Sequence, residues 1–162
     1  METTFALRNC IPVLLLTALL AGCNAARPLP PIKAIATREE IMHHLVIPNA
    51  KTVWDSSGTI YTEKGVVERA PKTDDDWFSV ESAATTLMEA GNLLMMDGRA
   101  MDQGKWMEMS KALRDSGDLV RQAAKKKDVA ALFEQGGVLF ESCQGCHFTY
   151  RFEKDPKTMR TH

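Results

Sequence analysis

The chain contains 162 residues, of which 44% are hydrophobic and 25% are charged, and its formal net charge at neutral pH is -1. This length and apolar content predict one folded domain with a single hydrophobic core. The balanced charge gives no sign of the basic surface that nucleic-acid binding requires, so we expect no nucleic-acid partner.

The N-terminal region predicts export from the cytoplasm. Residues 11–20 form an apolar run that is too short to cross a membrane, and a Leu-Ala-Gly-Cys sequence ends at Cys23. Small residues before a cysteine are typical of the cleavage site of a bacterial lipoprotein signal. We therefore interpret residues 1–22 as a signal peptide and Cys23 as the lipidated first residue of the mature chain. An ordinary secretory peptide with a coincidental cysteine is the alternative.

Residues 23–36 predict a lipid-anchored linker. Positions 24–33 hold three prolines and no apolar periodicity, which is typical of an extended segment. Asn24 stands where an aspartate retains many lipoproteins at the inner membrane. We therefore expect the domain on the periplasmic side of the bacterial cell envelope, with the outer membrane favoured over the inner one.

A first helix is predicted over residues 37–56. Apolar residues recur there at helical spacing, and Thr37 followed by Glu40 has the spacing of a capping box. Pro48 predicts a kink or break near Ile47, because proline lacks an amide hydrogen and crowds the preceding turn. Residues 57–74 contain glycines and few periodic apolar positions, so we predict a long connection there.

Three further helices follow by the same periodicity. We predict one from about 74–76 to 97–98, one that starts between 99 and 105 and ends at 125–127, and one that begins after Asp128 as the N-cap. Gly136-Gly137 in the last helix predicts a place where another element packs closely. With no alternating strand pattern, the chain is predicted to be all-α, an antiparallel four-helix bundle over 37–152 with a flexible tail at 153–162.

The end of the last predicted helix carries a C-x-x-C-H motif, Cys143-Gln144-Gly145-Cys146-His147. This is the attachment sequence of a c-type haem. Residues three and four apart share one face of a helix, so two thiols and an imidazole lie together. Each thiol would form a thioether with a haem vinyl group, and His147 would ligate the iron.

Other uses of these cysteines fit the sequence less well. A thiol oxidoreductase places C-x-x-C early in a βαβ unit, which the sequence does not predict. A zinc site needs further ligands at close spacing, and His43, His44 and His162 are distant in sequence. Cys10 is lost with the signal peptide and Cys23 takes lipid, so no cysteine is left for a structural disulfide.

Four helices with C-x-x-C-H near the end of the last one resemble the class II cytochromes c, which are the cytochrome c prime family and its low-spin relatives. The sequence His147-Phe148-Thr149-Tyr150-Arg151 is similar too, with an aromatic residue three positions after the ligand and a basic residue next. The resemblance implies one covalent haem c inside the bundle, covered by the first helix. A homodimer is compatible with this resemblance.

The resemblance places the sixth iron ligand, where there is one, on the first helix. At 100° per residue, Met42 falls in the same arc as the inward-facing residues Leu45, Asn49 and Val53, whereas His43 lies at the border and His44 points to water. We predict Met42 as the ligand. A plain core methionine, or ligation by His43, is the alternative.

Other side chains are candidates for the surroundings of the haem. Arg151 lies one turn beyond His147 and could contact a haem propionate, or it could be a solvated arginine. Four aromatic residues could form walls of the pocket or belong to the ordinary core: Trp77, Trp106, Phe133 and Phe140.

These features predict one-electron transfer to redox partner proteins of the cell envelope, at a membrane reached through the N-terminal lipid. The sequence contains no catalytic carboxylate pair, Ser/His/Asp set or phosphate loop, so we assign no enzymatic activity. One alternative is a five-coordinate haem protein that binds nitric oxide or carbon monoxide, with Met42 only shielding the distal side. A lipoprotein in which haem has a structural role is another.

Overall fold

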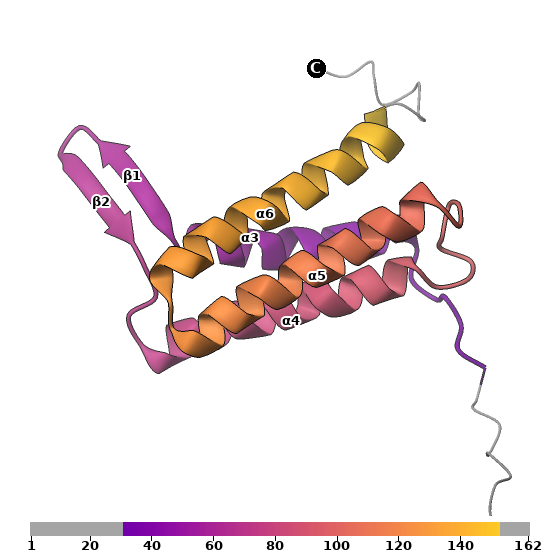
Figure 1. The fold of residues 1–162 in the computed structure, drawn as a ribbon, viewed down its shortest axis with the longest axis horizontal. Helices are drawn as coiled ribbons and strands as arrows, with labels where there is room; N and C mark the ends of the chain where they lie inside the picture. Colours follow the sequence, from indigo (N-terminus) through magenta and orange to yellow (C-terminus); the bar gives the residue numbers. More distant parts are fainter. Residues whose placement is uncertain (1–30, 153–162) are drawn as a thin grey trace, which may run out of the picture. The chain divides into compact units, whose positions relative to one another are not determined.

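Helices dominate the part of the chain that the structure, a computed structural model, describes, which is residues 31–152 (Figure 1). By its internal contacts the chain divides after Ile32, and every described helix and strand belongs to the unit that begins at Lys33. The predicted signal peptide, the lipidation site Cys23 and the tail over 153–162 lie outside the described residues.

Four helical segments follow one another along the described residues, which confirms the prediction of a mostly helical chain. The first segment consists of a short helix, a π-helical turn and a longer helix, and the last segment also ends in a π-helical turn. The bounds are Arg38–Ile41 for α2, Met42–Val46 for η1, Ile47–Asp55 for α3, Asp74–Leu94 for α4, Lys105–Lys126 for α5, Val129–His147 for α6 and Phe148–Phe152 for η2.

The first helical segment begins and bends where its sequence predicts. The Thr37 hydroxyl accepts the amide of Glu40 at 3.1 Å, and the Glu40 carboxylate accepts the amide of Thr37 at 2.8 Å, so the capping box is formed. Pro48 lies in the first turn of α3, where its missing amide hydrogen is tolerated. The wide turn η1 precedes it, and the amide of Ile47 reaches back to the carbonyl oxygen of Met42. The disturbance near Ile47 is therefore a widened turn without a break.

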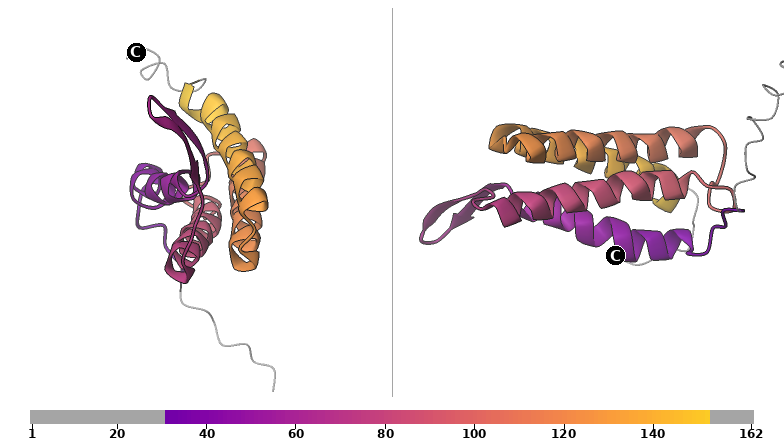
Figure 2. Two further views of the ribbon diagram at one scale, coloured as in Figure 1. Left: turned by 90° about the vertical axis from the view of Figure 1, so that its left-hand side faces the viewer. Right: turned by 90° about the horizontal axis from the view of Figure 1, so that it is seen from below.

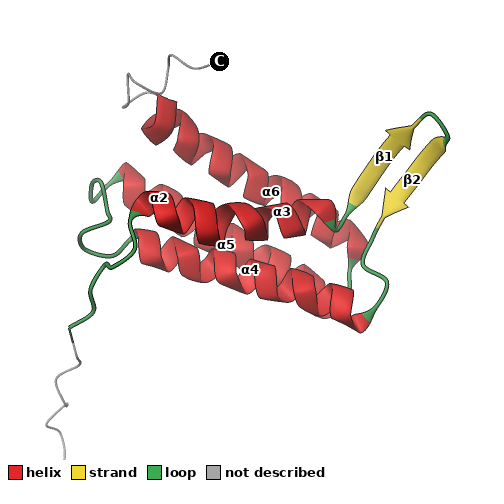
Figure 3. Cartoon of the chain, turned by 180° about the vertical axis from the view of Figure 1, so that it is seen from behind, coloured by secondary structure: helices red, strands yellow, loops and turns green. Residues whose placement is uncertain are grey.

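Residues 58–69 form a β-hairpin, so the prediction of a chain without strands is wrong at this point (Figure 3). Strand β1 (Gly58–Thr62) pairs antiparallel with β2 (Gly65–Arg69), and Ile60 lies opposite Val67. Both strands hold β-branched residues, and β1 also holds Tyr61, and such residues favour extended backbone. Every residue of β2 is exposed. Because β2 buries neither face, its sequence lacks the alternation by which strands are usually recognised.

Helices α4 and α6 each begin at a side-chain cap. Thr73 caps α4 by accepting the amide of Asp76 at 3.1 Å, and the Asp76 carboxylate accepts the amide of Thr73 at 2.9 Å. The carboxylate of Asp128 accepts the amide of Ala131 at 3.0 Å at the start of α6, as predicted. Lys127 adopts a left-handed conformation with φ of 53° and ends α5.

The helices lie side by side, with α5 against both α4 and α6, and α3 against α4 (Figure 1, Figure 2). A Cβ atom at Gly91 of α4 would lie 2.8 Å from the Ser110 carbonyl oxygen of α5, so glycine permits this close approach. All four helical segments contribute side chains to the fully buried core: Val53, Val80, Leu87, Val120, Leu132 and Leu139.

The predicted close approach at Gly136-Gly137 is found at only the first of the two glycines. The indole of Trp54 donates to the carbonyl oxygen of Gly136 at 3.0 Å, and a Cβ atom there would lie 3.8 Å from the ring, in ordinary contact. Gly137 is exposed, and a Cβ atom there would have nothing within 4 Å. This bond joins α3 to α6.

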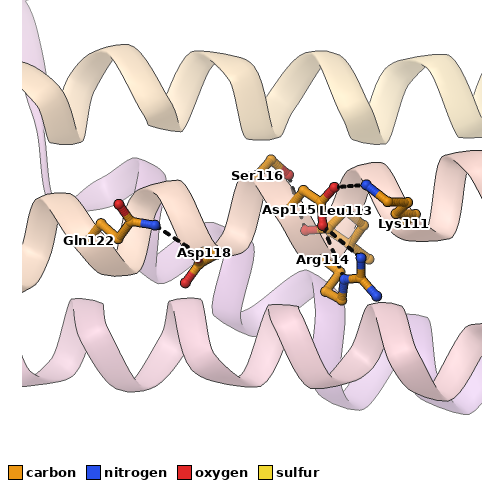
Figure 4. Close-up of polar contacts among 7 residues, drawn as sticks. All are labelled: Lys111, Leu113, Arg114, Asp115, Ser116, Asp118 and Gln122. Carbon is orange, nitrogen blue, oxygen red and sulfur yellow. Dashed lines mark hydrogen bonds and ion pairs between the residues drawn. The ribbon is translucent and has the colours of Figure 1, made fainter.

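Polar side chains of α5 bond mainly along their own helix (Figure 4). Asp115 contacts both Lys111 and Arg114, and the Gln122 amide donates to Asp118 at 2.8 Å. Pairs three and four residues apart on one helix each stabilise it by only about 0.2–0.5 kcal/mol. The position of α5 therefore depends on its buried face.

Candidate functional site

A cavity of about 680 Å³ lies among the helical segments. Its size falls within the roughly 300–1,000 Å³ that is usual for sites of small molecules and cofactors. The lining is mostly apolar and comes from η1, all four of the longer helices and η2. It includes Val46, Ala50, Leu94, Met109, Leu113 and Phe140.

The predicted attachment residues all line this cavity. Cys143, Cys146 and His147 come from the last turns of α6, and each is half-buried. Their spacing along the helix places both sulfur atoms and the imidazole on one side. Both cysteines are free thiols. Within residues 31–152, no three His, Cys, Asp or Glu side chains gather as a set that could hold a metal ion by themselves.

Burial sets the protonation of these three groups. Loss of hydration raises the pKa of Cys143, and it raises the pKa of Cys146 to about 11, with a smaller contribution from the neighbouring Cys143. Both side chains are therefore thiols near neutral pH. Burial and, second, the charge of Arg151 lower the pKa of His147. The imidazole is therefore neutral at pH 7, which is the form that ligates a metal.

The candidate sixth ligand lies in a separate wall of the same cavity. Met42 is half-buried in η1 and lines the cavity, whereas His43 and His44 are exposed and are not among its lining residues. Met42 begins one π-helical turn, and His147 directly precedes the other. Such turns are rare in helices and are frequent at functional sites.

The aromatic wall differs from the one that the sequence predicts. Of the four predicted residues, only Phe140 lines the cavity. Phe133 is 64% exposed, and Trp77 and Trp106 are buried elsewhere in the core. Trp54 lines the cavity and was missed; its ring meets that of Phe140 edge-on, with centroids 5.6 Å apart.

The wide turn η1 explains why Trp54 was missed. On an uninterrupted α-helix, Trp54 would point about 120° away from Met42. A π-helical turn accommodates roughly one extra residue, which moves the following side chains by about 100° and brings Trp54 close to the direction of Met42. The proline at position 48 was the available signal, since it predicts a disturbed turn between these two residues.

No family model, curated protein or solved structure matches the chain. None of the helices within residues 31–152 is long and apolar enough to cross a membrane. The interpretation of the cavity therefore depends on its own residues.

Two cationic side chains also line the cavity. Arg151, the predicted propionate contact, is exposed in η2, and Lys51 comes from α3. The Lys51 ammonium group lies 2.7 Å from the Asp55 carboxylate, and both groups are largely exposed. A cofactor with an apolar body and acidic edge groups would match an apolar cavity that has cations on its lining.

Proposed function

We propose that the chain attaches one haem c through Cys143 and Cys146, and that His147 and Met42 would hold its iron. In this proposal the protein is an electron carrier of the bacterial cell envelope, held on the periplasmic side of the outer membrane by a lipid on Cys23. The proposal follows the resemblance to the class II cytochromes c, including an antiparallel four-helix bundle that surrounds the haem.

One observation carries the proposal: the two thiols and the imidazole of the C-x-x-C-H motif open into a single apolar cavity that Met42 also lines. The donor set suits haem, which takes most of its ligation from the porphyrin and needs only one or two protein ligands. The neutral state of His147 suits ligation as well. The volume of the cavity, its apolar lining and its donor atoms are thus all compatible with a haem.

The chain's own residues tune and protect the site. Haem iron supplies the one-electron chemistry, by alternating between the ferrous and ferric states. A thioether ligand from Met42 favours the ferrous state and raises the reduction potential. The apolar lining, which includes Trp54 and Phe140, would surround the apolar body of the haem. Arg151 binds a haem propionate in this proposal.

Absorption spectra of the lipidated holoprotein test the ligand set. We expect the native protein to be six-coordinate and low-spin in both oxidation states. We expect Met42→Ala to make the reduced protein high-spin and to lower its potential. The matched control is Met101→Ala, because Met101 is 43% exposed and is not among the residues that line the cavity.

Each other outcome has a definite meaning. A low-spin reduced spectrum that survives Met42→Ala would contradict ligation by Met42, and loss of that spectrum in His43→Ala would assign the ligand to His43. A high-spin reduced spectrum in the native protein would favour the gas-binding alternative, in which Met42 only shields the iron.

A further inference from the structure

The turn that follows His147 is fastened to the start of α5 by a buried tyrosine. Tyr150 lies in η2, three residues after His147, and its side chain is buried while that of Phe148 is 72% exposed. The Tyr150 hydroxyl donates to Oδ2 of Asp102 at 2.5 Å. This bond connects the end of the last helix to the connection between α4 and α5.

Asp102 is itself held in place by the backbone of α5. Its Oδ1 accepts the amides of Gly104 and Trp106, each at 3.0 Å. The first amides of a helix have no partner within the helix, so a carboxylate that accepts them is well placed. The second oxygen, Oδ2, is thereby directed at the Tyr150 hydroxyl.

Trp106 provides a second contact to the same tyrosine. The two rings meet edge-on, with centroids 5.0 Å apart and an angle of 82° between their planes. The Trp106 indole donates to the carbonyl oxygen of Leu94 at 2.8 Å, at the end of α4. Leu94 lines the cavity, as does Met109, which lies three residues after Trp106. Tyr150 therefore contacts Trp106, a side chain that is hydrogen-bonded to a residue of the cavity wall.

We propose that Tyr150, Asp102 and Trp106 form a clamp that fixes the direction in which His147 enters the cavity. This inference rests on the proposed function of His147 as a ligand of the haem iron. Tyr150 is not among the residues that line the cavity, so it is a positioning residue that acts through His147. Tyr150 follows His147 by three residues along the continuous backbone of α6 and η2, so fixing the Tyr150 ring restrains the turn from which the imidazole projects.

The test uses the only two tyrosines of the chain, Tyr61 and Tyr150. Tyr150→Phe removes the hydroxyl of the clamp and keeps the ring. Tyr61→Phe removes a hydroxyl from an exposed side chain of the hairpin and is the matched control. In the holoproteins we expect Tyr150→Phe to shift both the reduction potential and the electron paramagnetic resonance spectrum of the oxidised iron. Tyr61→Phe leaves both as in the native protein.

A purely structural role gives a different result. If Tyr150→Phe lowers the urea midpoint of unfolding and leaves the potential and the resonance spectrum unchanged, the clamp does not position His147, and the inference is overturned. Should Tyr150→Phe fail to fold, Asp102→Ala decides by the same two measurements, because it removes the acceptor of the Tyr150 hydroxyl and leaves both aromatic rings of the clamp in the chain. A native chain that carries no covalent haem would instead refute the proposed function, which separates the two failures.

Discussion

Burial at the end of α6 determines which reactions its side chains can undergo. Cys143 and Cys146 are thiols at neutral pH because their surroundings disfavour a negative charge, and His147 is neutral because the same surroundings disfavour a positive one. A thiol is a much weaker nucleophile than a thiolate. The folded, haem-free chain is therefore expected to react slowly at these positions.

Alkylation of the haem-free chain measures this effect at Cys146. With a pKa of about 11 against an ordinary value of 9.0, its thiolate fraction at pH 8 is lower by about a hundredfold. We expect iodoacetamide to modify folded Cys146 more slowly than the urea-unfolded chain by on the order of a hundredfold. Equal rates before and after unfolding would show that the thiol is not buried as the structure has it.

Helices α4 and α5 lie so close at Gly91 that any side chain at this position is expected to destabilise the protein. Because a Cβ atom would lie 2.8 Å from the Ser110 carbonyl oxygen and 2.9 Å from Arg114, we expect Gly91→Ala to lower the free energy of unfolding by about 1–3 kcal/mol. Gly137→Ala is the control, since its methyl group meets nothing within 4 Å. That variant is expected to gain about 0.5–1 kcal/mol from helix propensity. Urea unfolding of the two variant holoproteins measures both changes in the free energy of unfolding. Equal changes would contradict the packing of α4 on α5.

The cap of α4 predicts how stability changes in acid. The pKa of Asp76 is held below its ordinary value of 3.8, first by the amide of Lys72 and then by Thr73. A carboxylate with a lowered folded-state pKa stabilises the protein above its unfolded pKa, and this contribution is lost as the pH falls through the folded value. We therefore expect the free energy of unfolding to decline below about pH 4.

Asp76→Asn isolates that contribution. The variant should show a shallower decline between pH 5 and pH 2 in urea unfolding series. Asp75→Asn, which removes one negative charge from the same helical turn, is the matched control. If the two variants have the same pH dependence, the bonds to Lys72 and Thr73 are not its cause.

Local sequence signals predicted the helices well and the exposed or distorted elements poorly. Thr37 and Asp128 mark helix starts because a cap depends on a few neighbouring residues. The hairpin at 58–69 was missed because β2 is exposed on both faces. Its sequence therefore shows no alternation of apolar and polar residues. Trp54 was missed because the regular helical period does not continue through η1. The C-x-x-C-H motif, in contrast, identifies its three residues by spacing alone, and the structure brings all three to one cavity.

At the level of the whole molecule, the site depends on elements far apart in the chain. The cavity takes Met42 from η1 and the attachment motif from α6, which are held together by contacts such as that of Trp54 with Gly136. The Asp102 bond to Tyr150 connects η2 to the segment between α4 and α5. The packing of the four helical segments therefore places Met42 and His147 in one cavity.

Intact-mass spectrometry of the chain under denaturing conditions tests whether that cavity holds a covalent haem. The protein is produced in a cell envelope that contains haem-attachment enzymes, as the native chain and as Cys143→Ser with Cys146→Ser. We predict that the native chain keeps the added mass of one haem after unfolding and that the double variant loses it. A native chain with only its apoprotein and lipid mass would contradict the proposed function.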